Sequence, residues 1–150
     1  LNFIAGLLLV VVFQDHMRIT NFEITGVIAG VSEEDLSRIE ETTFWVFLYV
    51  MDVISDYHVP SLCGARIAQG TLDHLVMRYL PDVAMHLEAL EVSLSVLTMQ
   101  WILSLFLTDF FPLTVLALLD HIIVHKSDVA VYVMGLITLT LCKEKILCVV

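Results

Sequence analysis

Apolar residues along the chain recur mainly at helical spacing. The clearest case is the stripe Leu72, Leu75, Val76, Tyr79 and Leu80, at positions i, i+3, i+4, i+7 and i+8, which predicts one buried face of a helix. Pro81 ends this helix or begins another. Residues 1–13 form a Leu-rich apolar run that is too long for a typical strand, so we interpret it as a buried helix. Alternation of apolar and polar residues is not sustained anywhere, so no strand is predicted.

Polar residues mark where two further helices begin. Residues 32–35, Ser-Glu-Glu-Asp, match the capping-box pattern, with acids in the first turn where the helix dipole favours them. This pattern predicts a helix that runs to about Tyr57. Near the end of the chain, Ser127 or Asp128 is the expected N-cap of a last helix over about 129–147.

The remaining segments complete the predicted architecture. Two apolar helices are expected over 96–110 and 112–124, separated near Pro112. Residues 14–31 mix polar residues with glycines, so we interpret them as a loop or an insertion. The sequence therefore predicts an all-α fold, a single domain of about six or seven short helices.

Composition narrows the class of protein. Of 150 residues 59% are apolar and 16% charged, so disorder is excluded, and the formal net charge of −10 argues against nucleic acid as a partner. The mean hydropathy of +0.90 raises the possibility of membrane spans. Only the uncharged run 92–108 approaches the roughly 20 residues that a span needs, and it carries six polar residues. We therefore expect no transmembrane segment, with a polytopic membrane protein as an alternative.

Neither the cysteines nor the histidines predict a metal site. Cys63, Cys142 and Cys148 are odd in number and contain no C-x-x-C pair, which favours reduced, buried thiols of an intracellular protein. His121 and His125 lie four residues apart and share a helix face, but the Glu of an H-E-x-x-H site is absent.

Other chemistry-bearing patterns are also missing. The sequence contains no G-x-S-x-G elbow and no glycine-rich phosphate loop, so no catalytic residue is predicted. Trp45 and Trp101 lie on strongly apolar stretches, so we expect both to be buried in the core.

Six segments form an ordered series of motifs. They are Leu1–Leu9, Glu41–Trp45, Leu62–Gln69, Tyr79–Leu87, Leu97–Phe106 and Pro112–Asp120. The series resembles the TBC domains, the Rab GTPase-activating family: the first segment is similar to the one after the family's Y-x-Q-G motif. The others are similar to E-x-x-F-W, L-x-G-x-x-x-x-Q, L-P-x-L-x-x-H-L, Q-W-F-x-x-x-F and P-x-x-x-x-x-x-W-D. The resemblance covers about residues 1–140 and implies an all-helical fold. The signature residues, for which it implies structural roles, are Gly6, Phe44, Trp45, Gln69, Pro81, Gln100, Trp101, Pro112 and Asp120.

The resemblance also implies a function. Family members stimulate GTP hydrolysis by Rab proteins with two inserted side chains, the Arg of I-x-x-D-x-x-R and the Gln of Y-x-Q-G. Neither motif occurs in this sequence, and the resemblance places both upstream of Leu1. Residues 1–150 would then be the C-terminal part of a Rab-GAP TBC domain. Asn2 and Phe3 are the expected partner-binding residues, because they would follow the Gln-finger loop.

In this interpretation the chain is a regulator and not an enzyme. Its partner is a GTP-bound Rab that supplies GTP and Mg²⁺, so the chain needs no cofactor. The implied process is vesicle trafficking, and the implied location is cytoplasmic or peripheral on endomembranes. A TBC-like interaction module that lacks the fingers and has no GAP activity is an alternative.

The chain departs from the family pattern at several positions. Leu119 stands where the family has Trp, Lys126 where a Gly is usual, and Tyr132 where an Arg is usual. Residues 14–38 are expected to form an insertion where many family members have a short acidic loop. Arg38 imitates the D-x-x-R part of the Arg-finger motif, but its order in the chain is wrong, so we interpret it as a helix-surface residue.

Overall fold

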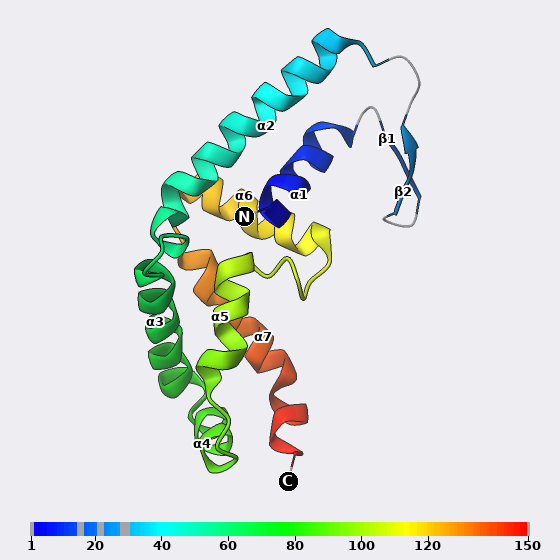
Figure 1. Ribbon diagram of the computed structural model, residues 1–150. Helices are drawn as coiled ribbons and strands as arrows, with labels where there is room; N and C mark the ends of the chain where they lie inside the picture. Colours follow the sequence, from blue (N-terminus) through cyan, green and yellow to red (C-terminus); the bar gives the residue numbers. More distant parts are fainter. Residues whose placement is uncertain (1, 15–16, 21–22, 28–30, 150) are drawn as a thin grey trace. The chain divides into compact units, whose positions relative to one another are not determined.

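The computed structural model describes residues 2–14, 17–20, 23–27 and 31–149, and α-helices dominate it (Figure 1). The elements in chain order are α1 (Asn2–Val12), β1 (Met17–Thr20), β2 (Glu23–Val27), α2 (Glu33–Ile54), the 3-10 helix η2 (Ser55–Tyr57), α3 (Cys63–Tyr79), α4 (Pro81–Ala89), α5 (Leu94–Ser104), α6 (Pro112–His125) and α7 (Val129–Leu147). The predicted all-α fold is confirmed, with one small hairpin added to it. Backbone contacts divide the chain into two compact units, unit 1 over Leu1–Asp52 and unit 2 over Val53–Val150.

The hairpin in unit 1 was not predicted. β1 pairs with β2 in antiparallel register, with an irregularity after Arg18. Sequence analysis assigned this segment to a loop because the two strands, of four and five residues, are too short to show sustained alternation. The β-branched residues Ile19, Ile24 and Val27 suit extended backbone. Residues 15–16, 21–22 and 28–30 of the expected insertion lie outside the described part of the chain.

The capping box at the start of α2 is confirmed. The Asp35 backbone N–H donates to Ser32 Oγ at 3.1 Å, and the Ser32 hydroxyl donates to Asp35 Oδ2 at 2.8 Å. Arg38 pairs with the same carboxylate from one turn further on and is exposed. These hydrogen bonds, that from Ser32 first, lower the pKa of Asp35. Arg38 is therefore a helix-surface residue, as the sequence indicated.

Unit 2 is built around one face of α3. Leu72, Val76 and Leu80 from the predicted stripe are buried, whereas Tyr79 at its edge is 61% exposed. The stripe forms a core cluster with α4 and α7, whose buried members are Leu72, Val76, Leu80, Val83, Leu87 and Leu139. Burial of such side chains is the main favourable term in folding, at about 1.5–3 kcal/mol each. A Lys143–Asp82 ion pair joins α7 to α4 at the surface.

Helix α5 ends earlier than the apolar pattern predicted. The expected helix reached Phe110, but α5 stops at Ser104 because Leu105 and Phe106 adopt left-handed backbone angles, with φ of 49° and 65°. Both residues are fully buried, and this burial offsets the cost of the unfavourable conformation. The Phe106 ring stacks on Trp101 at 5.4 Å between centroids. Hydrophobic periodicity carries no information on such a reversal, since the buried residues continue through it.

The start of α7 is held by a hydrogen-bond network. α7 begins at Val129, as predicted, and Asp128 occupies the N-cap position without a capping hydrogen bond from its side chain. The hydroxyls of Tyr57 and Tyr132 both donate to Asp128 Oδ2, at 2.7 and 2.6 Å. Tyr57 is almost fully buried, so the network connects η2 to α7 through the interior of unit 2. Burial raises the pKa of Tyr57, and it raises the pKa of Tyr132 to about 12.

Several predicted burials are wrong or only partly correct. Trp45 is 60% exposed and is not a core anchor, while Trp101 is half-buried against the core cluster. Cys63, Cys142 and Cys148 are free but exposed. High local hydropathy does not decide which side of a helix faces the core, and this is why the assignments failed. Within the described ranges no helix combines the length and apolar character needed to cross a membrane.

Gly64 and Gly70 of α3 provide a matched test of packing. A Cβ added at Gly64 would lie 2.5 Å from Asp56 Cβ and 2.6 Å from its carbonyl carbon, whereas one at Gly70 would meet nothing within 4 Å. Gly64→Ala is therefore expected to lower the free energy of unfolding by about 1–3 kcal/mol. Gly70→Ala should raise it by about 0.4–1 kcal/mol. Denaturant unfolding of both variants measures this, and equal effects would contradict the close contact between Gly64 and Asp56.

The tyrosine network predicts a loss of stability at alkaline pH. At pH 7, Tyr57→Phe removes a hydrogen bond to a carboxylate and should cost about 1.5–3 kcal/mol. An unfolded tyrosine has a pKa of about 10, below the folded-state value of Tyr132. The stabilisation is therefore fully present below pH 10 and is lost as the pH rises from 10 towards 12. Unfolding curves across this range should show a smaller loss for Tyr132→Phe than for the parent chain, and no such difference for the exposed control Tyr79→Phe.

Candidate functional site

The predicted partner-binding residues lie at the start of α1. Asn2 is exposed, and Phe3 leaves 68% of its surface accessible. Asn2 is the first residue of α1, and water can satisfy its exposed side chain. One turn further, Gly6 has open space around its Cα. An aromatic side chain held outside the fold beside an amide is a surface that a partner could cover.

Phe44 and Trp45 of the signature do not lie in the core. Phe44 is 54% exposed, and its ring meets that of Trp45 edge to face at 5.5 Å. The buried residues of α2 are Ile39, Thr43, Val50 and Ile54. Phe44 and Trp45 are therefore exposed residues of α2 whose rings contact each other.

The other signature residues serve as caps, hydrogen-bond donors or core neighbours in unit 2. Pro81 and Pro112 occupy the first positions of α4 and α6, where a missing N–H costs nothing. Gln100 Nε2 donates to Thr108 Oγ1 at 3.1 Å across the end of α5. Asp120 is exposed on α6. Trp101 packs against the core cluster, and the other residues lie at separate places in unit 2.

Gln69 supports a half-buried carboxylate on α3. Its amide donates to Asp73 Oδ2 at 2.8 Å, while Asp73 Oδ1 is buried and has no hydrogen-bond partner among the described residues. Burial raises the pKa of Asp73. Likewise, burial lowers the pKa of His58, whose Nε2 also lacks a partner in the described part. Both shifts favour the neutral form of a desolvated group.

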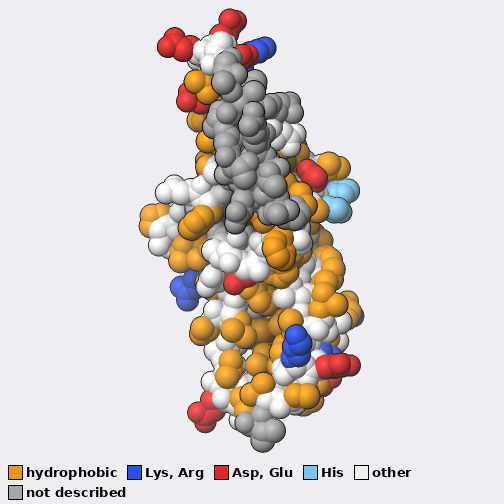
Figure 2. Space-filling view, turned by 90° about the vertical axis from the view of Figure 1, so that its right-hand side faces the viewer, with side chains coloured by type: hydrophobic (Ala, Val, Ile, Leu, Met, Phe, Trp, Pro, Cys, Tyr) orange, Lys and Arg blue, Asp and Glu red, His pale blue; other side chains and the backbone are white. Residues whose placement is uncertain are grey.

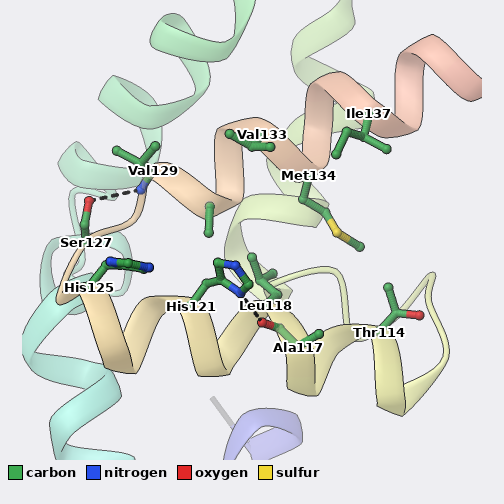
Figure 3. Close-up of a pocket in the computed structure, with 11 residues that line it drawn as sticks. Thr114, Ala117, Leu118, His121, His125, Ser127, Val129, Val133, Met134 and Ile137 are labelled. Carbon is green, nitrogen blue, oxygen red and sulfur yellow. Dashed lines mark hydrogen bonds between the residues drawn. The ribbon is translucent and has the colours of Figure 1, made fainter.

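A concave surface with a volume of about 420 Å³ lies between α6 and α7. We name it the α6–α7 groove. Its lining residues are Thr114, Ala117, Leu118, His121, His125, Ser127, Val129, Ala130, Val133, Met134 and Ile137. Figure 3 shows the His121 and His125 side chains rising from α6 towards α7, with Val133, Met134 and Ile137 along the opposite wall. The sequence pointed to the histidine pair but not to the groove. The spacing of Val129, Val133 and Ile137 at i, i+4 and i+8 is the pattern that could have indicated the apolar wall on α7.

The rings of the two histidines lie next to each other on α6. Their ring centroids are 5.9 Å apart, and His121 Nδ1 donates to the Ala117 carbonyl at 2.9 Å. Across the residues that the structure describes, no three His, Cys, Asp or Glu side chains gather into a metal site. The arrangement offers hydrogen bonds at one end of an apolar surface.

Exposed hydrophobic side chains extend beyond this groove. Figure 2 shows them spread among charged ones over the lower part of the view, which the helices of unit 2 occupy. Large examples on α6 and α7 are Leu113, Val124, Val129, Val133, Ile137 and Leu141.

Comparisons with known proteins identify the relatives of the chain. The model of the Rab-GTPase-TBC domain family matches residues 1–147. Growth hormone-regulated TBC protein 1 of Xenopus tropicalis is 30% identical over 96 residues, which are 63% of this chain and 28% of that protein. TBC1 domain family member 2A of Ailuropoda melanoleuca is 33% identical over 69 residues, 45% of this chain and 8% of that protein. Small G protein signaling modulator 3 of Homo sapiens is 30% identical over 69 residues, 45% of this chain and 9% of that protein.

The matches therefore cover only a small part of each of these relatives. No solved structure matches the chain. The family model, in contrast, extends over all seven described α-helices, in the order in which the motifs occur. On this evidence the chain belongs to the Rab-GTPase-TBC domain family.

Proposed function

We propose that the chain is the C-terminal part of a TBC domain that stimulates GTP hydrolysis by a GTP-bound Rab-type GTPase. The observation that carries this proposal is the family match over residues 1–147. A relative that is named as a modulator of small G protein signalling agrees with it. The domain would act in vesicle trafficking, in the cytoplasm or at the surface of endomembranes. It would need no cofactor of its own, because the partner brings GTP and Mg²⁺.

Catalytic stimulation requires side chains that this chain does not carry. Inserted fingers stabilise charge on the transferring phosphoryl group and are worth about 10³–10⁵ in rate. The sequence contains neither I-x-x-D-x-x-R nor Y-x-Q-G. Arg38 is paired with Asp35 on the surface of α2, so it is not available as a substitute finger. In this proposal the 150 residues position the fingers and contribute to the Rab-binding surface.

Asn2 and Phe3 are the residues of this chain that we assign to that surface. Both are exposed at the start of α1. From the resemblance to the family pattern we expect them to follow the Gln-finger motif. An aromatic side chain that is exposed in the free protein can become a central contact in a complex. The Asn2 amide can hold the preceding loop by a hydrogen bond to its backbone.

This proposal predicts that the chain alone leaves GTP hydrolysis at its intrinsic rate. Phosphate release from a panel of GTP-loaded Rab proteins, with and without the 150-residue chain, measures this. The same assay with a longer protein, in which a segment bearing both motifs precedes Leu1, should show stimulation. Stimulation by the chain alone that Arg38→Ala abolishes would contradict our assignment of Arg38. Binding of the longer protein to GTP-loaded Rab without stimulation would instead indicate an interaction module.

A prediction for Asn2 separates its role in Rab-stimulated turnover from any effect on stability. In the longer protein, Asn2→Ala should lower Rab-stimulated turnover about tenfold, which corresponds to about 1.4 kcal/mol of transition-state stabilisation. Its melting temperature should hardly change, because Asn2 is exposed. The control is Gln14→Ala, another exposed amide just beyond the opposite end of α1. Equal turnover for the two folded variants would contradict a role of Asn2 at the Rab-binding surface.

A further inference from the structure

The α6–α7 groove is apolar along most of its length. Ala117 and Leu118 of α6 line it together with Ala130, Val133 and Met134 of α7. Val133 and Ile137 remain about half exposed, at 47% and 52%, so the free protein leaves this surface in water. Covering it with an apolar chain would be favourable in proportion to the area removed from water. A volume of about 420 Å³ falls within the range of small-molecule sites.

The end of the groove at the α6–α7 connection is polar. Ser127 Oγ accepts the Val129 backbone N–H at 3.3 Å, which leaves the hydroxyl proton available for a ligand. His125 lines the same end, as Figure 3 shows, and a ring N–H is present in every protonation state of a histidine. The His121 ring lies next to it, with Nδ1 already engaged by Ala117. The polar end therefore offers at least two hydrogen-bond donors to an acceptor group.

The lining of the groove suits an acceptor head group better than a cationic one. Although the protein carries a net charge of −10, no Asp or Glu is among the lining residues. Two acids adjoin lining residues in the sequence. Asp128 accepts hydrogen bonds from Tyr57 and Tyr132, and Asp120 is exposed on α6.

We propose that the α6–α7 groove binds a medium-chain fatty acid. Its carboxylate would accept hydrogen bonds from Ser127 and His125. Its acyl chain would extend over Ala117 and Val133 towards Ile137. This occupant matches the site in both respects, an acceptor head group at the polar end and a flexible apolar tail along the rest. The proposal is independent of GTPase stimulation, because it concerns a different surface of the chain.

A series of monomeric ligands tests the proposal directly. Isothermal titration of the 150-residue chain with octanoate, decanoate and dodecanoate, each below its micelle concentration, should give a Kd that falls about three- to fourfold per methylene. Decyltrimethylammonium, with the same tail and a cationic head group, should bind at least tenfold more weakly than decanoate. Equal affinity for the two head groups, or no dependence on chain length, would overturn the proposal.

Substitutions in the groove have matched controls elsewhere on the chain. Val133→Asp places a charge on the apolar wall and should weaken decanoate binding at least tenfold. Val124→Asp alters a 75% exposed residue of α6 outside the lining and should have no effect. At the polar end, the double variant Ser127→Ala, His125→Gln should weaken the binding of decanoate but not of decanol. The control His74→Gln on α3 should leave the binding of both ligands unchanged. Circular dichroism confirms that each variant is folded before binding is compared.

Other occupants of the groove give different results. If a second copy of the chain covers it, sedimentation will show a dimer that Val133→Asp dissociates, and decanoate binding will be absent. If the surface serves a membrane, vesicles with anionic lipid will bind the chain while monomeric decanoate will not. Either result would overturn the assignment of a fatty acid. A monomeric chain that binds decanoate with the chain-length and head-group dependence above supports it.

Discussion

The close approach of α7 to α3 is the contact on which the rest of unit 2 depends. A Cβ added at Gly135 would lie 3.0 and 3.1 Å from the two δ-methyl groups of Leu72, which is fully buried. This spacing lets Leu72, Val76 and Leu139 form one core cluster with α4. It also fixes the line of α7, whose opposite side forms the wall of the α6–α7 groove. The same helix thus joins the core to the concave surface.

The departures from the family pattern acquire physical meaning in this arrangement. Lys126, where the family usually has Gly, ends α6 in a left-handed conformation with φ of 48°. Gly adopts this conformation without steric cost, so the Lys lowers the stability of the turn. Tyr132, where an Arg is usual, gives its hydroxyl to Asp128 and holds the N-cap of α7. Leu119, in place of Trp, is buried on α6. Lys126 and Tyr132 thus lie at or near the α6–α7 connection, and Leu119 lies on the buried side of α6.

Two exposed surfaces stand out among the described residues. Exposed Asn2 and Phe3 on α1 and the α6–α7 groove belong to different units, and no catalytic motif accompanies either. This is consistent with a family whose members act on the nucleotide site of a partner. The buried hydrogen-bond network of Tyr57, Asp128 and Tyr132 has a structural role, since it joins η2 to the start of α7.

The sequence by itself determined the helices, their caps and the family. Helical periodicity, the Ser32 capping box and the break before Val129 are local features, so neighbouring residues were enough to predict them. Which side of a helix is buried depends on the helices packed against it, and for this reason Trp45 was wrongly placed in the core. The reversal after Ser104 depends on tertiary burial of Leu105 and Phe106. The α6–α7 groove forms only when these two consecutive helices pack side by side, so only the tertiary structure could reveal it.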